Sequence, residues 1–167
     1  MKWQKALLVF LVLFFASCGY KPSAKYARDI LGEKVSTFVI ISKEDPENSV
    51  LIKDAIDTAI IDVFHASLTD KAHSTSHLII SVSTPSYSPI QYDQNGFVIA
   101  YRMTITLNIN RYTHGKSTPY TAKGYYDFAV TPNAVITDQQ RFDAIRYSAN
   151  KAFVAFVAQI SAEGSRG

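Results

Sequence analysis

One predicted hairpin constrains the fold of this sequence more than any other feature. Asn95-Gly96 is the strongest short turn signal for a β-hairpin, and apolar side chains alternate with polar ones on both sides of it. Residues 97–109 carry apolar side chains at every second position, so we expect a long strand with one buried face. Residues 77–92 supply its partner strand. The chain is therefore expected to contain an antiparallel sheet.

Two prolines predict where this hairpin lies in the sheet. If Asn95-Gly96 is a two-residue turn, Tyr92 faces Ile99 across the hairpin, and Pro85 and Pro89 occupy non-hydrogen-bonded positions. Their missing N–H groups then point away from the partner strand, which is tolerated at an edge. We therefore expect the outer half of the hairpin to be an exposed edge that protrudes from the domain.

Two further strands are expected. Residues 35–42 form a short apolar run rich in β-branched side chains, which is typical of a buried strand. A second turn at residues 113–116 precedes a strand over residues 119–130. One face of that last strand carries Tyr120, Ala122, Gly124, Tyr126 and Phe128.

Two amphipathic helices complete the pattern. Asp45 and Pro46 suit the first turn of a helix, and an apolar stripe follows within residues 51–64. Thr137 and Gln140 have the spacing of a capping box, which starts a final helix that ends near residue 162. The apolar stripe of the final helix consists of Phe142, Ile145, Ala149, Ala152, Phe153, Phe156, Val157 and Ile160.

The order of these elements is strand, helix, three strands, helix. A strand–helix–strand crossover makes the first pair of strands parallel, and the short turns make the others antiparallel. We therefore predict an α+β fold in which two helices pack on one face of a mixed four-stranded sheet. The 167 residues suit one such domain, which we place at residues 34–164.

The N-terminus predicts a lipoprotein signal peptide. Two lysines precede eleven consecutive apolar residues, 6–16, a run too short to cross a bilayer. Cys18 directly follows Ala16-Ser17, which indicates cleavage after residue 17 and lipidation of the Cys18 thiol. The alternative is an ordinary signal peptide that happens to end beside a cysteine. Lipid chains on Cys18 would anchor the protein to a membrane, and Gly19 is compatible with sorting to the outer membrane.

Residues 18–33 are predicted to be a lipidated tether. Pro22, Ser23 and Gly32 interrupt this segment, and it has no sustained apolar period. The predicted organisation is thus a signal peptide over residues 1–17, a tether over 18–33 and the domain over 34–164.

The charge balance excludes one class of partner. The full sequence has 17 Lys and Arg and 14 Asp and Glu side chains, a formal net charge of +3. Removal of Lys2 and Lys5 with the signal peptide leaves 15 basic against 14 acidic side chains, a net charge of +1. Nucleic-acid binding requires a basic stripe, so we expect no nucleic-acid partner.

The sequence contains no catalytic or metal-binding motif. His73 and His77 with nearby Asp70 could mimic a metal site, but three well-placed ligands are needed and a solvated Ser/Thr-rich loop is favoured. Asp54 and Asp57 lie on the polar face of a predicted helix, where solvation is favoured over acid–base chemistry. One cysteine excludes internal disulfides and sites with several thiolates. We expect no metal, no cofactor and no enzymatic activity.

Seven of the ten tyrosines fall between residues 87 and 126. Cross-strand packing explains tyrosines on the predicted core face, such as Tyr101 and Tyr126. Tyrosine is also enriched at interfaces. Tyr125 on the opposite face, with Tyr87 and Tyr92 near the protruding hairpin end, are the candidates for partner contacts. Both interpretations of the cluster stay open at this point.

The order and spacing of several segments resemble the LPS-assembly lipoprotein LptE family. The resemblance covers the whole mature domain and includes Cys18-Gly19-Tyr20, the strand and Pro-bearing loop before the first helix, and the long final helix. It also includes Asn95-Gly96 leading into residues 100–108, and Tyr120-Thr121-Ala122-Lys123. The family's two helices against a four-stranded sheet agree with the fold predicted above.

This resemblance implies a function. Such lipoproteins lie in the lumen of the LptD β-barrel of the outer membrane, assist its assembly and help lipopolysaccharide to reach the outer leaflet. Loops beside the Asn-Gly turn contact lipopolysaccharide in family members, which implies Asn95, Gly96 and Phe97 here. The turn carries no base, so Arg102 and Arg141 are the nearest basic candidates in the sequence.

Two alternatives come from other classes of protein. A lipoprotein regulator of a cell-wall synthase would need a much longer tether than residues 21–33. A small periplasmic hydrolase would need a nucleophile–base pair, which the sequence patterns do not supply.

Overall fold

The structure is a computed structural model that describes residues 23–40, 50, 52–54, 56–58, 60–61, 67–83, 85–132 and 134–166. Its elements are α2 (Ser23–Leu31), β1 (Lys34–Ile40), β2 (Ser67–Leu68), the 3-10 helix η1 (Lys71–His73), β3 (Ser76–Val82), β4 (Ser86–Tyr92), β5 (Val98–Thr113), β6 (Lys116–Ala129) and α4 (Asp138–Gly164). Residues between 50 and 61 are helical wherever they are described, and we call them the central helix. The predicted signal peptide and Cys18 lie outside the described residues.

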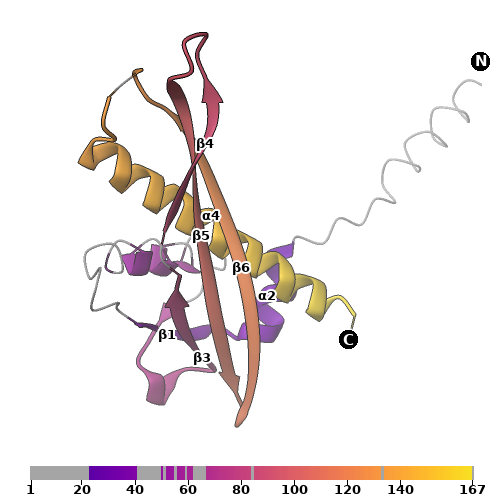
Figure 1. The fold of residues 1–167 in the computed structure, drawn as a ribbon. Helices are drawn as coiled ribbons and strands as arrows, with labels where there is room; N and C mark the ends of the chain where they lie inside the picture. Colours follow the sequence, from indigo (N-terminus) through magenta and orange to yellow (C-terminus); the bar gives the residue numbers. More distant parts are fainter. Residues whose placement is uncertain are drawn as a thin grey trace, which may run out of the picture.

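Strand β5 organises the sheet (Figure 1). It pairs with β6 along one side. On its other side it pairs with β4 over residues 98–104 and with β3 over residues 107–112, and all three pairings are antiparallel. Strand β1 is parallel to both β3 and the two-residue β2. The predicted mixed α+β fold is confirmed. The sheet has six strands instead of four. Strand β2 is added, and the region expected to be one strand over residues 77–92 contains two, β3 ending at Val82 and β4 beginning at Ser86.

The predicted hairpin register was wrong by one residue. Tyr92 pairs with Val98 instead of Ile99, because the loop contains three residues, 94–96, and not two. The amide of Asp93 donates to the carbonyl of Phe97 at 2.8 Å, and Gly96 has φ +84°. Three-residue hairpin loops of this kind require a left-handed residue at their last position, which glycine supplies.

The hairpin protrudes as predicted. Strand β6 ends opposite Ala100, so the ribbon formed by residues 91–98 continues beyond the rest of the sheet (Figure 1). Pro89 lies on the exposed edge strand β4 and pairs with Tyr101 of β5. The register of this pairing shifts between Pro89 and Tyr92. Prolines and bulges at an edge both discourage further strand pairing.

The helices pack on one face of the sheet. Figure 1 shows α4 passing behind β5 and β6, and alternate side chains of β5 and β6 are buried on that side. Ile52, Ile56 and Ile60 of the central helix are fully buried, as its apolar stripe predicts. The other expected stripe positions of the central helix lie outside the described residues.

Helix α4 begins where the sequence predicts. The side chain of Thr137 accepts from the amide of Gln140, and the side chain of Gln140 accepts from the amide of Thr137, which is a complete capping box. The predicted apolar stripe is buried except for Phe142, which is 37% exposed. Phe142 lies in the second turn of the helix, and its ring contacts the guanidinium of Arg146 at 6.0 Å.

Helix α2 corrects the prediction of an unstructured tether over residues 18–33. Residues 23–31 are helical, and Ala27 and Leu31 are completely buried in the core. The helix ends at Gly32, which has φ +80° and donates its amide hydrogen to the carbonyl of Arg28 at 2.7 Å. One i,i+4 pair of apolar side chains is too short a pattern to predict a helix from sequence.

Candidate interaction surface

The side of the sheet that faces away from the described helices is a broad exposed surface, which we call the open face. The side chains of β5 and β6 alternate between the helices and this side, so every second residue of each strand contributes to it. Its middle is polar and carries the charge of Lys123, which lies opposite Thr106. Thr121 Oγ1 donates to Asn108 Oδ1 at 3.1 Å. Members of the open face are Phe38, Ile79, Arg102, Thr104, Thr106, Asn108, Asn110, Thr121, Lys123, Tyr125 and Asp127.

An ion pair lies at the upper end of the open face. Arg102 Nε and a terminal guanidinium nitrogen donate to the two carboxylate oxygens of Asp127, each at 2.7 Å. These hydrogen bonds lower the pKa of Asp127, and the bonded carboxylate raises the pKa of Arg102. The guanidinium also lies 5.7 Å from the ring centre of Tyr125, which is 46% exposed. The pair therefore holds Arg102 flat against the sheet beside an accessible aromatic ring.

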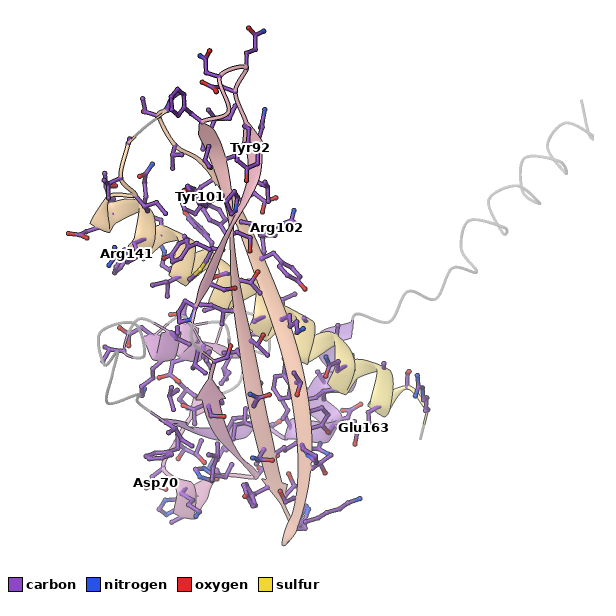
Figure 2. The ribbon with its side chains drawn as sticks, in the orientation of Figure 1. Asp70, Tyr92, Tyr101, Arg102, Arg141 and Glu163 are labelled. Carbon is purple, nitrogen blue, oxygen red and sulfur yellow. The ribbon has the colours of Figure 1, made fainter. Side chains whose placement is uncertain are left out.

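The hairpin tip presents apolar side chains on a rigid turn. The carboxylate of Asp93 accepts from the amides of Asn95 and Phe97 at 2.9 and 2.8 Å. This arrangement uses the one acidic side chain of the turn to fix its backbone. Tyr92 is 57% and Phe97 41% exposed, so the tip offers aromatic surface and little free charge (Figure 2).

The predicted contact residues therefore divide into separate groups. Tyr92, Asn95, Gly96 and Phe97 share the tip, whereas Arg102 and Tyr125 share the open face. Figure 2 shows Arg141 on α4, apart from Arg102.

Tyr87 belongs to neither of these groups. Its half-buried ring packs edge-on against Phe128 at 6.3 Å, on the helix side. Tyr101 and Tyr126 stack on the same phenylalanine, each at 6.2 Å. Cross-strand packing thus explains these three tyrosines, while Tyr92 and Tyr125 are available for contacts.

A serine and a histidine meet where the sequence predicted no such pair. Ser36 Oγ lies 2.7 Å from His77 Nδ1, and Ser36 donates to Ser74 Oγ at 2.9 Å. Ser74 in turn donates to the carbonyl of Lys71 at 3.0 Å. Because a carbonyl only accepts, the chain of donors runs from His77 Nδ1–H through both serines. His77 is thus a donor to Ser36 and not a base for it, opposite to what a hydrolase needs.

The other candidates for chemistry are polar surface groups. His73 Nδ1 lies 2.7 Å from the carboxylate of Asp70 on an exposed turn, and His77 is engaged with Ser36. In the described parts of the chain, no group of three or more His, Cys, Asp and Glu side chains could hold a metal ion.

The two aspartates of the central helix also have separate contacts. Asp57 binds Lys53 and accepts from Thr37 Oγ1 at 2.7 Å, whereas Asp54 is exposed. Lys53, Asp57 and Thr37 line an open polar pocket of about 320 Å³ together with Leu68 and Thr69. Its charged groups already satisfy one another.

The sequence did not predict two of these pairs, Arg102–Asp127 and Ser36–His77. Asp127 could have been found, because a two-residue turn at His114-Gly115 places it opposite Arg102. Ser36 and His77 are 41 residues apart and meet only through the parallel register of β1 and β3, for which the sequence has no local signal.

A comparison with protein families decides how this fold is classified. The model of the LptE lipopolysaccharide-assembly family matches residues 37–160. The chain belongs to the LptE family. Comparison with curated proteins gave no significant match.

Solved structures share the fold of this LptE-family chain. A putative lipoprotein from Caulobacter crescentus matches with a TM-score of 0.57 and 8% identity, covering 87% of this chain and 100% of that one. Rare lipoprotein B from Shewanella oneidensis matches with a TM-score of 0.52 and 14% identity, covering 80% and 97%. Protein XCC0632 from Xanthomonas campestris matches with a TM-score of 0.51 and 11% identity, covering 81% of this chain and 88% of that one.

The family match agrees with a membrane-associated lipoprotein. Among the helices of the described residues, none has the length and apolar character needed to cross a bilayer. The predicted signal peptide and the lipid on Cys18 are outside these residues and stay predictions.

Proposed function

We propose that this protein is a lipid-anchored outer-membrane lipoprotein that occupies the lumen of an LptD-type β-barrel. In this position it assists assembly of the barrel and the insertion of lipopolysaccharide into the outer leaflet. The observation that carries the proposal is the LptE-family match across residues 37–160. The anchor is Cys18, with the domain facing the periplasm and entering the barrel.

The shape and chemistry of the domain support this proposal. The inner wall of a large β-barrel is polar, and the middle of the open face is polar too, with Thr104, Thr106 and Asn108 beside Lys123. The Arg102–Asp127 pair neutralises the charges at the upper end. We therefore assign the open face to the barrel wall and the tip at Tyr92 and Phe97 to the narrow interior, where lipopolysaccharide passes.

The same structure weakens the main alternative. A regulator of a cell-wall synthase must cross the periplasm on a long tether. The sixteen steps from Cys18 to Lys34 span at most about 58 Å even when fully extended, and the docked α2 shortens that reach further.

A pull-down tests the proposal. The tagged, lipidated protein is extracted from outer membranes in mild detergent, and stoichiometric partners are identified by mass spectrometry. We expect an LptD-type barrel at near one-to-one. Recovery of a cell-wall enzyme without a barrel would replace the proposal with the regulator.

A matched pair of variants tests the assigned surface. Asn108→Arg adds a charge and bulk in the middle of the open face, whereas Asn150→Arg makes the same change on the exposed side of α4. We expect Asn108→Arg to reduce recovery of the barrel and Asn150→Arg to leave it unchanged. Equal recovery with both variants would remove the open face from the barrel contact.

A further inference from the structure

Helix α2 lies between the predicted lipid attachment at Cys18 and the sheet. Its two completely buried side chains, Ala27 and Leu31, pack into the core beside α4. Gly32 follows with φ +80° and turns the chain into β1. Part of the segment that connects the anchor to the domain is therefore folded onto the domain.

One polar contact between the sheet and α2 can break without dismantling its neighbours. Arg111 of β5 donates to the carbonyl of Ile30 at 3.4 Å and to the carboxylate of Glu163 on α4 at 3.1 Å. Tyr120 of β6 donates to the other oxygen of Glu163 at 2.5 Å. When α2 leaves, the Arg111–Glu163–Tyr120 cluster stays intact, and the released guanidinium group meets water. The strands and α4 keep their mutual contacts.

Detachment also unfolds α2. Isolated helices shorter than about 12 residues are marginal in water, and α2 has nine residues. Its helical form therefore depends on docking. Two arrangements follow: docked and helical, or released and extended.

The two arrangements differ in reach. With α2 docked, the five steps from Cys18 to Ser23 span at most about 18 Å. With α2 released, the sixteen steps from Cys18 to Lys34 span at most about 58 Å. Gly32 is the hinge between these arrangements, because its positive φ belongs to the docked one.

We propose that α2 is a releasable strap that sets how far the domain can move from the membrane. The strap rests on the lipid attachment that belongs to the proposed function, but it does not depend on the barrel. A docked strap holds the domain beside the bilayer, and a released strap lets it travel about threefold farther.

Hydrogen exchange tests the strap. The lipidated mature protein in detergent is compared with Leu31→Ala and Leu107→Ala, which truncate two leucines that are both completely buried. In the unmodified protein we expect the α2 amides to exchange faster than those of β5 and α4, since α2 opens alone. Leu31→Ala should speed exchange by roughly 30-fold or more in α2, and also in the β5 and α4 amides that exchange by global unfolding, because both openings lose the Leu31 contacts. Leu107→Ala should speed exchange in β5 and α4 and leave α2 unchanged, because Leu107 stays buried when α2 opens alone.

Equal protection of α2, β5 and α4 in the unmodified protein would show that α2 opens only with global unfolding and would overturn the strap. The same holds if Leu107→Ala speeds α2 as much as β5 and α4. If Leu31→Ala does not fold, the comparison of α2 with β5 in the unmodified protein decides the matter alone. No partner is present in these measurements, so the result is independent of whether a barrel is recovered in the pull-down.

Discussion

Gly124 of β6 touches the backbone of α4 at Ala152. A Cβ atom at Gly124 would stand 2.4 Å from the amide nitrogen of Ala152 and 1.9 Å from the carbonyl oxygen of Ser148. Both neighbours are backbone atoms of a helix, so no side chain can rotate away. The distance between the sheet and α4 is therefore set by the absence of a side chain at this one position.

Gly124→Ala should consequently destabilise the fold. Pushing α4 off the sheet separates Phe153 and Phe156 from the core, and we expect a loss of about 3 kcal/mol or more in the free energy of unfolding. Gly96→Ala is the control, because no atom lies within 4 Å of the added Cβ and only its positive φ opposes the change, at about 1 kcal/mol. Urea denaturation measures both. A Gly124→Ala protein as stable as the parent would contradict this account of the close approach.

The Tyr120–Glu163 hydrogen bond predicts a loss of stability in alkali. Burial, together with the bond to Glu163, raises the pKa of Tyr120 to about 12 from 10.0. The folded state thus keeps its proton longer than the unfolded state, so the stabilisation is complete below pH 10 and is lost as the pH rises from 10 to about 12.

Tyr120→Phe tests that prediction. We expect it to reduce the dependence of the urea midpoint on pH above pH 10, and to cost about 1 kcal/mol at pH 7 through the lost hydrogen bond. Tyr92→Phe, at the exposed tip, should retain the parent's pH dependence. An unchanged alkaline profile for Tyr120→Phe would argue against the assignment.

The lowered pKa of His77 predicts a loss of stability as the pH decreases. Burial and the nearby charge of Lys71 lower the pKa of His77 below 6.5. The unfolded state therefore takes up a proton first, and stability present above pH 6.5 falls as the pH drops below it. Because the neutral ring already donates from Nδ1, the bond to Ser36 remains in both protonation states.

His77→Asn keeps a donor near the Nδ1 position and removes the titration. We expect its urea midpoint to change less between pH 7.5 and 5.5 than that of the parent. His114→Asn is the matched control, since His114 is exposed in a turn at φ +49°, where asparagine is well tolerated. If both variants behave alike, His77 is not the source of the pH dependence.

The Arg102–Asp127 pair predicts a measurable pKa change on the open face. The hydrogen bonds from Arg102 are the largest cause that lowers the pKa of Asp127, while Lys151 contributes the smallest effect. Arg102→Gln should therefore raise the Asp127 pKa toward 3.8, and Lys151→Gln should raise it less. Carboxyl carbon chemical shifts followed by NMR over pH give both values. The reverse order would show that the bidentate geometry is not formed in solution.

The sequence predicted the features that depend on local pattern. The Thr137–Gln140 capping box and the alternating faces of β5 and β6 need only a few neighbouring residues, and the structure confirms them. The predicted hairpin register was wrong because Asp93 closes the turn with its own carboxylate and backbone, which adds a residue to the loop. A turn motif alone does not determine which residues flank it.

The parts that were not predicted depend on contacts between distant segments. Helix α2 is held by Ala27 and Leu31 against a core supplied by the rest of the chain, and a tertiary contact of this kind leaves little trace in nine residues. The Ser36–His77 pair arises from the parallel register of β1 and β3. For the contact residues, the sequence identified Tyr92 and Tyr125 correctly as exposed but could not separate them from the half-buried Tyr87.

Strand β5 is long enough to serve the core and the hairpin in succession. Its half nearest Thr113 pairs with β3 over the core, and its half nearest Val98 pairs with β4 in the ribbon that leads to the tip. Two residues added to each arm of that ribbon would advance the tip by about 7 Å while every side chain kept its face. No contact of the core would change. The length of the hairpin can therefore change in evolution independently of the stability of the domain that carries it.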